Sequence, residues 1–367
     1  MDLHVLIVPG DGIGTEVTRE AVRVLEHVCG KYKHKLSQKE ALLGGIAIHK
    51  TGNPFPDETA RLALEADATV MGAVGLPEFD NMPPSQRPEK GLLGIRKTMG
   101  VYANLRPVRA YAALIESSPL KNHLVEGTDM IIVRELNGGI YYGTPRGISG
   151  SGDEERGTNT MTYTRAEIAR VTRMAFNLAR NRRKKLTSVD KSNVLETSIL
   201  WRQTVAEVGR DYPDVTVENL YVDNCAMQLI LKPKSFDVVV TNNLFGDILS
   251  DEAGVLAGSL GMLPSAAIGG FAGLYEPIHG TAPDIAGKSI ANPIGAIASV
   301  AMMFEHSFKL PEAARRIESA IAKTLDKGYR TRDIYSESAA DAASHKLVTT
   351  KEMADAICRY IENINAT

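Results

Sequence analysis

Three aspartates have the spacing and sequence context of a candidate metal site. Asp247 and Asp251 stand four residues apart in "LFGDILSDE", so a helix over this segment places both carboxylates on one face. Asp223 follows another apolar segment, in "NLYVDN". Like charges at this spacing repel mildly unless a cation lies between them, and carboxylate oxygens are the ligands that Mg²⁺ and Mn²⁺ prefer. The alternative is a set of ordinary acids near helix N-termini, where the macrodipole favours negative charge.

Three arginines form a candidate site for carboxylates. They are Arg96 in "GLLGIRK", Arg106 in "ANLRPV" and Arg134 in "IIVRE". A guanidinium binds a carboxylate through two parallel hydrogen bonds, so three of them in one cleft would suit a di- or tricarboxylate. Taken singly, each is equally explained as a surface or ion-pair residue. Arg134 is the strongest candidate because it follows four apolar residues at the carboxyl end of an expected strand.

A lysine and a tyrosine complete the candidate chemistry. Lys191 in "SVDKSN" comes just after an apolar strand, where a lowered pKa would allow it to act as a base. An exposed lysine beside an ordinary acid explains the same pattern. Tyr141 in "GGIYYG" is either a core residue or a proton donor to an enolate.

The segments around these residues alternate between helical and strand periods, which predicts an α/β fold. After an apolar strand at residues 5–8, apolar residues recur at helical spacing: Val17, Ala21, Val24, Leu25 and Val28. The run "ATVMGAVG" at residues 68–75 is typical of a strand buried on both faces. Later strands in "DMIIVRE", "LTSVDKSN", "LYVDNCA" and "FDVVVTNN" end in charged or amide residues. Ligands of α/β sheets bind at that carboxyl edge.

The first loop, "PGDGIG", is close to a dinucleotide-binding fingerprint. Its glycines, Gly10, Gly12 and Gly14, are spaced G-x-G-x-G, and Thr15 stands where the third glycine belongs. That glycine normally lets the helix and strand pack closely. The loop alone therefore indicates only a strand-to-helix turn.

Length and composition bound the class of protein. A chain of 367 residues exceeds the roughly 250–300 residues that one hydrophobic core supports, which predicts two domains. With 42 basic and 44 acidic residues, a nucleic acid or membrane surface is not expected as the main partner. We interpret the basic run at residues 180–185 as a solvated helix end. Three widely spaced cysteines, no signal-peptide pattern and no long apolar run predict a soluble, cytoplasmic protein.

Two glycine-rich segments interrupt the alternation of helices and strands. Residues 143–164 are polar and too long for an ordinary loop, so a surface arm and a disordered lid both fit. Residues 266–287 form a nearly uncharged loop, and two helical patterns follow it.

Eight motifs, in order along the chain, resemble one family. They are "PGDGIG", "GLLGIRK", "NLRP", "RELNGGIYYG", "DKSNVLETS", "YVDNCAMQL", "TNNLFGDILSDEAG" and "GLYEPIHGTAPDIAGKSIANP". Together they resemble the β-hydroxyacid oxidative decarboxylases, the isocitrate/isopropylmalate dehydrogenase family. The similarity runs nearly from end to end.

The resemblance implies a two-domain α/β fold with a large mixed, mostly parallel sheet that is not of Rossmann topology. Residues 1–103 and 258–367 would form a discontinuous cofactor-binding domain. Residues 104–257 would form a central domain, and the arm at about 143–164 would clasp a second subunit.

The activity implied by the resemblance is an oxidative decarboxylation. The expected reaction converts 3-isopropylmalate to 2-oxo-4-methylpentanoate and CO₂ in leucine biosynthesis, with NAD and with Mg²⁺ or Mn²⁺. The expected assembly is a homodimer with shared active sites, with no nucleic-acid or membrane partner. Isocitrate, homoisocitrate or tartrate are the alternative substrates. A non-catalytic metabolite-binding protein is the competing class, against which the intact candidate residues argue.

Roles for the candidate residues also follow from the resemblance. Arg96, Arg106 and Arg134 would hold the substrate carboxylates, and Asp223, Asp247 and Asp251 would hold the metal and, through it, the substrate. Lys191 would take the hydroxyl proton, Tyr141 would protonate the enolate, and Lys191 and Asp223 would come from the second subunit. On a helix, Leu92 shares a face with Arg96 and Leu93 is adjacent, so the two leucines would form the wall for an isopropyl group.

The cofactor is expected against a loop far from "PGDGIG". The residues expected at NAD are Ile13, Gly75, Glu89, His279, Gly280, Thr281, Ala282, Pro283, Asp284, Ile285, Ala286, Gly287 and Asn292. Asp284 can accept hydrogen bonds from the ribose hydroxyls of NAD and would repel the phosphate of NADP, so Asp284 and Ile285 indicate NAD. Leu76 and Glu78 depart from residues common in the family, beside the nicotinamide.

Overall fold

The chain divides into two compact units. The computed structural model describes residues 1–337 and 342–363. The first unit comprises Met1–Val101, Ala110–Asn122 and Gly254–Thr367, and the second comprises Tyr102–Arg109 and His123–Ala253. The chain thus passes between the units at residues 101/102, 109/110, 122/123 and 253/254. The segment 110–122, which we assigned to the central domain, packs with the first unit. The end of the expected cofactor domain, 364–367, lies outside the described residues.

The first unit contains five strands of mainly parallel sheet. Their order is β2 (Lys35–Glu40), β1 (Asp2–Gly10), β3 (Ala68–Ala73), β12 (Gly273–Pro277) and β11 (Pro264–Ile268). β1 pairs in parallel with both β2 and β3, β12 runs parallel to β3, and β11 is antiparallel to β12. All six residues of β3 are buried, as the continuous apolar run predicted.

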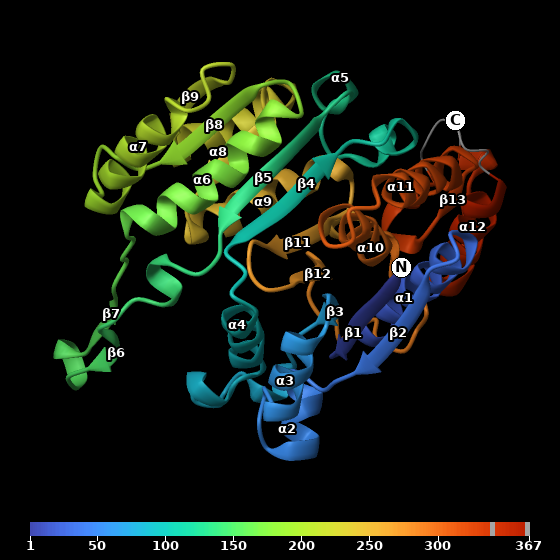
Figure 1. Cartoon of the computed structure of the whole chain (residues 1–367), viewed down its shortest axis with the longest axis horizontal. Helices are drawn as coiled ribbons and strands as arrows, with labels where there is room; N and C mark the ends of the chain where they lie inside the picture. The colour runs from blue at the N-terminus through green and yellow to red at the C-terminus, as the bar shows by residue number, and fades with distance from the viewer. Residues whose placement is uncertain (338–341, 364–367) are drawn as a thin grey trace. The chain divides into compact units, whose positions relative to one another are not determined.

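Helices from both ends of the chain cover this sheet. α1 (Gly14–Lys31) buries the predicted stripe of Val17, Ala21, Val24, Leu25 and Val28. It packs against α10 (Ile294–His306) and α12 (Thr350–Asn363), and α11 (Pro311–Asp326) packs against both of these C-terminal helices (Figure 1). The remaining helices are α2 (Gly45–Thr51), α3 (Asp57–Glu65) and α4 (Pro88–Met99). One core is therefore built from chain segments that are distant in sequence.

The second unit also contains five strands. Their order is β4 (Ala103–Arg109), β5 (Asp129–Glu135), β10 (Val238–Thr241), β8 (Lys185–Asp190) and β9 (Thr216–Tyr221). Only β4 and β5 are antiparallel; the other pairs are parallel. The helices are α5 (Asn122–Val125), α6 (Arg165–Arg180), α7 (Glu196–Gly209), α8 (Val222–Leu231) and α9 (Asn243–Gly254). The prediction of a mixed, mostly parallel α/β fold is confirmed. In the first unit, β3 pairs with β12, a strand from a distant part of the chain.

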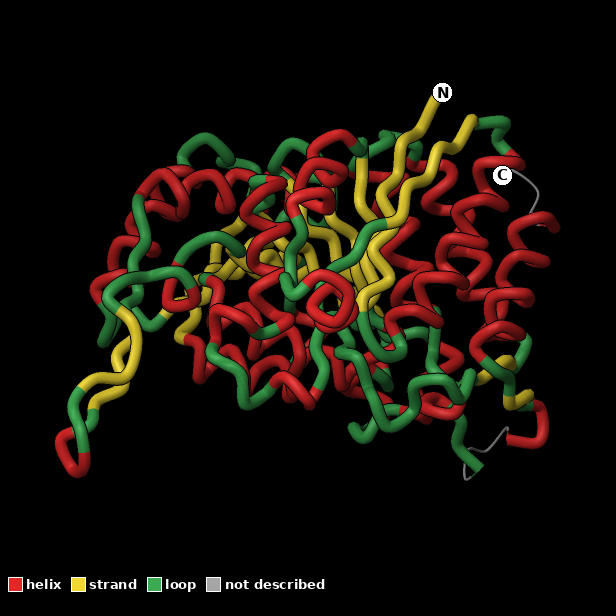
Figure 2. The backbone as a smooth tube through the Cα atoms, turned by 90° about the horizontal axis from the view of Figure 1, so that it is seen from below, coloured by secondary structure: helices red, strands yellow, loops and turns green. Residues whose placement is uncertain are grey.

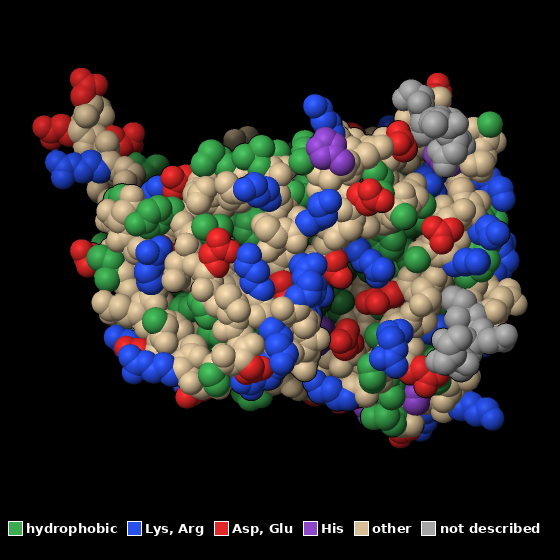
Figure 3. Space-filling view, turned by 90° about the horizontal axis from the view of Figure 1, so that it is seen from above, with side chains coloured by type: hydrophobic (Ala, Val, Ile, Leu, Met, Phe, Trp, Pro, Cys, Tyr) green, Lys and Arg blue, Asp and Glu red, His purple; other side chains and the backbone are tan. Residues whose placement is uncertain are grey.

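The basic run lies at the end of α6 and in the turn after it, as predicted, but it is not fully solvated, because the Arg182 side chain is only 22% exposed. Arg180 pairs with Asp214, and Arg182 pairs with Asp129 and Asp237. Lysine and arginine side chains are interspersed with acidic ones on the face shown in Figure 3. Among the described residues, no helix is long and apolar enough to cross a membrane.

The glycine-rich segment at 143–164 contains a two-stranded hairpin. β6 (Arg146–Ser149) pairs in antiparallel register with β7 (Arg156–Asn159), and every residue of both strands is exposed. Figure 2 shows the hairpin projecting away from the other elements of the second unit. An exposed hairpin agrees with the surface-arm interpretation of this segment.

Candidate active site

Two of the candidate aspartates lie on α9. Asp247 and Asp251 are one turn apart, as their spacing predicted, with side chains that are 35% and 60% exposed. α9 starts at Asn243 because Asn242 caps it. The Oδ1 of Asn242 accepts the backbone N–H of Phe245 at 2.9 Å. The surrounding protein displaces water from one side of Asp251 and raises the pKa of its carboxyl, while Arg106 acts in the opposite direction.

Two of the candidate arginines meet these aspartates. In the antiparallel register of β4 and β5, Arg134 lies opposite Asn104, and Arg106 is two residues further on the same face. Arg134 Nη1 pairs with Asp247 Oδ1, and Arg106 Nη1 lies 3.5 Å from Asp247 Oδ1 and 3.3 Å from Asp251 Oδ1. Both arginines are buried. The sheet register therefore creates a compact group of two guanidinium and two carboxylate groups.

Tyr141 belongs to the same group. It ends a short turn, Gly139–Tyr141, that follows β5. Its hydroxyl donates to Asp247 Oδ2 at 2.9 Å, and the Arg134 guanidinium carbon lies 5.7 Å from the centre of its ring. Burial, and then the negative charge of Asp247, raise the pKa of Tyr141. The phenol therefore remains protonated and able to donate a proton.

Lys191 and Asp223 form a separate ion pair. Lys191 follows β8, Asp223 lies in the first turn of α8, and Lys191 Nζ is 2.5 Å from Asp223 Oδ1. This hydrogen bond lowers the pKa of Asp223. Within residues 1–337 and 342–363, no three His, Cys, Asp or Glu side chains converge as a metal site. One chain thus brings Asp247 and Asp251 together without Asp223.

The remaining substrate candidates lie on α4 in the first unit. Arg96 is 7% exposed and donates through Nη2 to Glu276 Oε1 at 2.6 Å. Glu276, on β12, is a buried acid that our sequence analysis missed. Leu92 and Leu93 are half-buried, so each keeps some apolar surface accessible.

The expected cofactor loop is bonded to the first loop of the chain. The backbone N–H of Ile13 donates to Thr281 O at 2.9 Å. A Cβ on Gly12, at φ +54°, would lie 2.2 Å from that same oxygen, so only glycine permits this approach. Glu16, in the first turn of α1, accepts the N–H groups of Gly287 and, at 3.2 Å, Ser289. Glu16 was not among our candidates, and it fixes one end of the loop.

Most residues of this loop, 279–287, are at least partly accessible. Gly280, Pro283, Asp284 and Gly287 are exposed, and Ala282, Ile285 and Ala286 are half-buried. Burial lowers the pKa of His279, whose Nδ1 lies 2.9 Å from Gly280 O. Its buried Nε2 has no hydrogen-bond partner among the described residues. An accessible carboxylate and a neutral imidazole fit the hydroxyl groups of a nucleotide ribose.

Two other cofactor candidates have structural contacts in the same unit. Gly75 has φ +130°, and a Cβ there would lie 3.2 Å from Glu89 Oε1. Asn292 precedes α10: its Oδ1 accepts the N–H of Ile294, the first residue of the helix, at 3.0 Å, and its Nδ2 donates to Asp333.

Asp11, in the loop "PGDGIG", binds backbone groups of two later segments. Its carboxylate is 3% exposed and accepts three backbone N–H groups, from Gly45 and Ile46 at 2.8 Å and from Gly75 at 2.9 Å. Gly45 and Ile46 begin α2, whose N-terminus favours negative charge. A carboxylate of the chain itself occupies that position. Its signal in the sequence was the single acid between the glycines.

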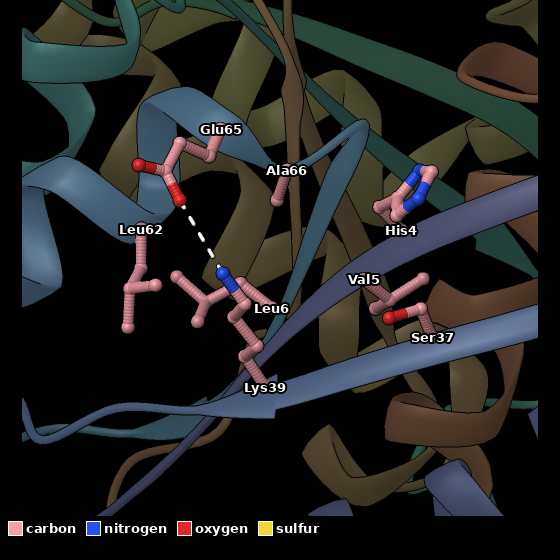
Figure 4. A pocket seen from close by; sticks show the side chains of 8 residues that line it. All are labelled: His4, Val5, Leu6, Ser37, Lys39, Leu62, Glu65 and Ala66. Atoms are coloured by element: carbon pink, nitrogen blue, oxygen red, sulfur yellow. Dashed lines mark hydrogen bonds and ion pairs between the residues drawn. The ribbon is translucent and has the colours of Figure 1, made fainter.

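A cavity of about 160 Å³ lies elsewhere, between β1, β2 and α3 (Figure 4). Two of its lining residues, Lys39 and Glu65, pair with each other at 3.4 Å, and a third, His4, lies 3.1 Å from Asp67 outside the lining. None of our candidate residues lines it.

Comparison with known proteins gives a consistent result. The sequence matches the isocitrate/isopropylmalate dehydrogenase family over residues 4–357. It is 56% identical to a 3-isopropylmalate dehydrogenase of Aquifex aeolicus, over 98% of this chain and 97% of that protein. It is 52% identical to one of Thermotoga maritima, over 99% and 100%. A crystal structure of isocitrate dehydrogenase from Methylococcus capsulatus superposes with a TM-score of 0.86 at 34% identity, covering 98% of this chain and 99% of that one.

Proposed function

Because the chain belongs to the isocitrate/isopropylmalate dehydrogenase family, we propose that it is an oxidoreductase that converts 3-isopropylmalate to 2-oxo-4-methylpentanoate and CO₂, a step of leucine biosynthesis. The observation that carries the proposal is the 52–56% identity to 3-isopropylmalate dehydrogenases over nearly the whole chain. Isocitrate is the second candidate substrate, since the isocitrate dehydrogenase structure is similar in fold at 34% identity.

Substrate binding is the role of the arginines. Arg106 and Arg134 present buried guanidinium groups on one face of β4 and β5, where each can bind a carboxylate through two hydrogen bonds. Arg96 would supply a third, and Leu92 and Leu93 an apolar wall. Leucine suits an isopropyl group and not the additional carboxylate of isocitrate, which is costly to desolvate without a donor.

The metal and NAD both fit the residues present. Asp247 and Asp251 are accessible hard oxygen donors of the kind that Mg²⁺ and Mn²⁺ select. The loop at 279–287, with Asp284 and the imidazole of His279, suits the adenosine end of NAD. When bound, the metal supplies Lewis-acid stabilisation of developing negative charge and NAD accepts the hydride.

The chain's own residues move the protons. Lys191 accepts the hydroxyl proton, directly or through a relay, as the hydride leaves the same carbon and a ketone forms. On the carbon next to this ketone, the bond to the carboxylate then breaks and releases CO₂. Tyr141, kept protonated by burial and by Asp247, donates a proton to the enolate carbon.

We also propose a homodimer in which Lys191 and Asp223 complete the site of the second subunit. Two observations support it. The pair lies outside the Asp247 group within one chain, and the second unit exposes large apolar side chains that a monomer leaves in water: Ile148, Val194, Met227, Leu231 and Ile248, each at least 56% exposed. A cytoplasmic location remains a prediction that follows from the three free cysteines.

One assay tests the substrate. The protein is incubated with NAD, Mg²⁺ or Mn²⁺, and each of four acids: 3-isopropylmalate, isocitrate, homoisocitrate and tartrate. We expect the highest kcat/KM for 3-isopropylmalate. A higher value for isocitrate would contradict the assignment, and no turnover of any acid would favour a non-catalytic metabolite-binding protein.

A further inference from the structure

Asn243 makes an unusual set of contacts at the centre of the candidate site. The residue is 1% exposed and begins α9. Its Oδ1 accepts the Nε–H of Arg134 at 2.8 Å, and its Nδ2 donates to the carbonyls of Leu136 and Gly138, both at 3.1 Å. The side-chain amide thus uses its acceptor and both donors. It connects the substrate-binding arginine to the turn that leads to Tyr141.

The bond to Nε fixes the orientation of the Arg134 guanidinium. A guanidinium is planar, so holding Nε sets the plane in which the two terminal nitrogens lie. α9 also presses against the stem of this side chain at Gly246, where a Cβ would lie 2.7 Å from both Cβ and Cγ of Arg134. Asn243 and Gly246 therefore hold Arg134 from the same helix.

The other contacts fix the turn before Tyr141. Glu135, 0% exposed, accepts the N–H groups of Asn137 at 2.9 Å and Gly138 at 2.8 Å. Asn243 binds two carbonyls of residues 136–138 and Glu135 binds two N–H groups of the same segment, so both kinds of backbone group are held there. The turn Gly139–Tyr141 starts directly after them.

A buried tyrosine forms a hydrogen bond with the backbone of Asn243. Tyr163 is 6% exposed, and its hydroxyl accepts the backbone N–H of Asn243 at 3.0 Å. Its ring lies under the glycine pair of "LNGG", where a Cβ on Gly138 or Gly139 would come within 2.5 and 2.4 Å of Tyr163 atoms. The glycines permit this close contact.

We propose that Asn243, supported by Tyr163 and Glu135, is a positioning residue that sets both the plane of the Arg134 guanidinium and the position of Tyr141. It acts on substrate binding through Arg134 and on proton donation through the turn at 136–138. The inference rests on the proposed function, because Arg134 and Tyr141 take their roles from it.

A double-mutant cycle tests this role. Asn243→Ser shortens the side chain so that it reaches none of its three partners, and Arg134→Lys keeps the charge but removes the Nε–H. With Arg134 intact, we expect Asn243→Ser to raise KM about tenfold and to lower kcat about tenfold. In the Arg134→Lys protein, we expect the same substitution to change KM less than about twofold while still lowering kcat about tenfold. Equal changes of KM in both proteins would overturn the proposal.

Controls separate positioning from stability. Asn242→Ser alters the adjacent buried asparagine but keeps an oxygen that can cap α9, so KM and kcat should change less than about twofold. If Asn243→Ser fails to fold, Tyr163→Phe, which keeps the ring and removes the acceptor of the Asn243 N–H, takes its place in the cycle. We expect a smaller rise of KM that is again lost in Arg134→Lys. Turnover of all four acids by the wild type is measured first. A wrong substrate assignment then appears in the wild type, and failure of the positioning role appears only in the variants.

Discussion

At the scale of single residues, the candidate site is organised by buried positive charge. Arg106 and Arg134 are 7% and 3% exposed and cannot lose their charge. A buried guanidinium needs an anionic partner, and in this structure Asp247 serves both. The carboxylate that pairs with the two arginines proposed to bind substrate is therefore also a metal candidate. Substrate carboxylates would replace Asp247 on the arginines and leave its oxygens available for a cation.

The choice between NAD and NADP is a residue-scale prediction. Asp284 is exposed, where its carboxylate would meet the ribose hydroxyls of NAD or repel the phosphate of NADP. Wild type should strongly prefer NAD, and Asp284→Ala should narrow the ratio of kcat/KM between NAD and NADP. Asp284→Lys with Ile285→Tyr should shift the preference towards NADP.

Asp284→Asn is the control for charge, because it keeps hydrogen-bonding groups and removes the repulsion. It should narrow the ratio by raising activity with NADP. If Asp284→Ala leaves the ratio unchanged, the cofactor is discriminated elsewhere.

The apolar wall on α4 gives a second residue-scale prediction. Leu92→Ser with Leu93→Asn should lower kcat/KM for 3-isopropylmalate at least tenfold, about 1.4 kcal/mol, because the isopropyl group loses apolar contacts. Leu64→Ser, at an exposed leucine of α3 in the same unit, is the matched control and should leave kcat/KM unchanged. If Leu64→Ser lowered kcat/KM as much as Leu92→Ser with Leu93→Asn, the loss would not be due to the apolar wall on α4.

At the scale of elements, the positions of α2 and α9 each depend on a close contact made by one residue, Asp11 for α2 and Gly246 for α9. Asp11 caps the N-terminus of α2 and also holds Gly75, so one carboxylate connects the first loop to two later segments. Gly246 lets α9 approach β5 closely enough for Asp247 to meet Arg134. In both places the geometry depends on a close contact that a different side chain would prevent.

Gly246→Ala tests the contact of α9 with Arg134. Alanine favours a helix over glycine by about 1 kcal/mol, but a Cβ at 2.7 Å from Arg134 forces a shift that typically costs about 1–3 kcal/mol. We expect Tm to fall by a few degrees and KM for the substrate to rise about tenfold. Gly30→Ala in α1, where nothing lies within 4 Å of the new Cβ, should instead leave KM unchanged and Tm equal or higher. A Gly246→Ala protein with wild-type Tm and KM would contradict the argument.

At the scale of the whole molecule, each active site should be shared between two chains. The arm of β6 and β7 is exposed along its full length, and a two-stranded hairpin is marginally stable by itself. A second copy that covered the arm would bury this surface.

Complementation tests the shared site. Lys191→Ala and Asp247→Asn homodimers should each be nearly inactive. Mixing and refolding the two should restore activity, because some heterodimers combine one intact Lys191 with one intact Asp247 in the same site. The readout is activity of heterodimers isolated by two different affinity tags. No recovery in confirmed heterodimers would show that each chain supplies its own complete site.

The sequence by itself predicted many of the elements and the residue types of the candidate site. It missed β11 and β12, which lie largely within residues 266–287 that we expected to form a loop. Periodicity placed the buried stripe of α1 and the buried strand β3 because helical and strand repeats reflect which side chains leave water. The spacing of Asp247 and Asp251 predicted a shared helix face because contacts between residues four apart are local. The loop with the incomplete fingerprint at Thr15 was predicted to be a strand-to-helix turn, and the structure shows β1 followed there by α1.

Only the tertiary structure decided which of these residues meet. Arg134 and Asp247 are 113 residues apart, and their contact depends on the pairing of β5 with β10, the strand that leads into α9, and on the approach of α9 at Gly246. The role of Asp11 was hidden for the same reason, because its partners belong to α2 and to the loop after β3. In the sequence, Asn243 was visible only as an amide residue after an apolar strand. Its three hydrogen bonds exist because packing brings a strand end, a turn and a helix start to one point, and contacts of that kind leave no periodic pattern in the sequence.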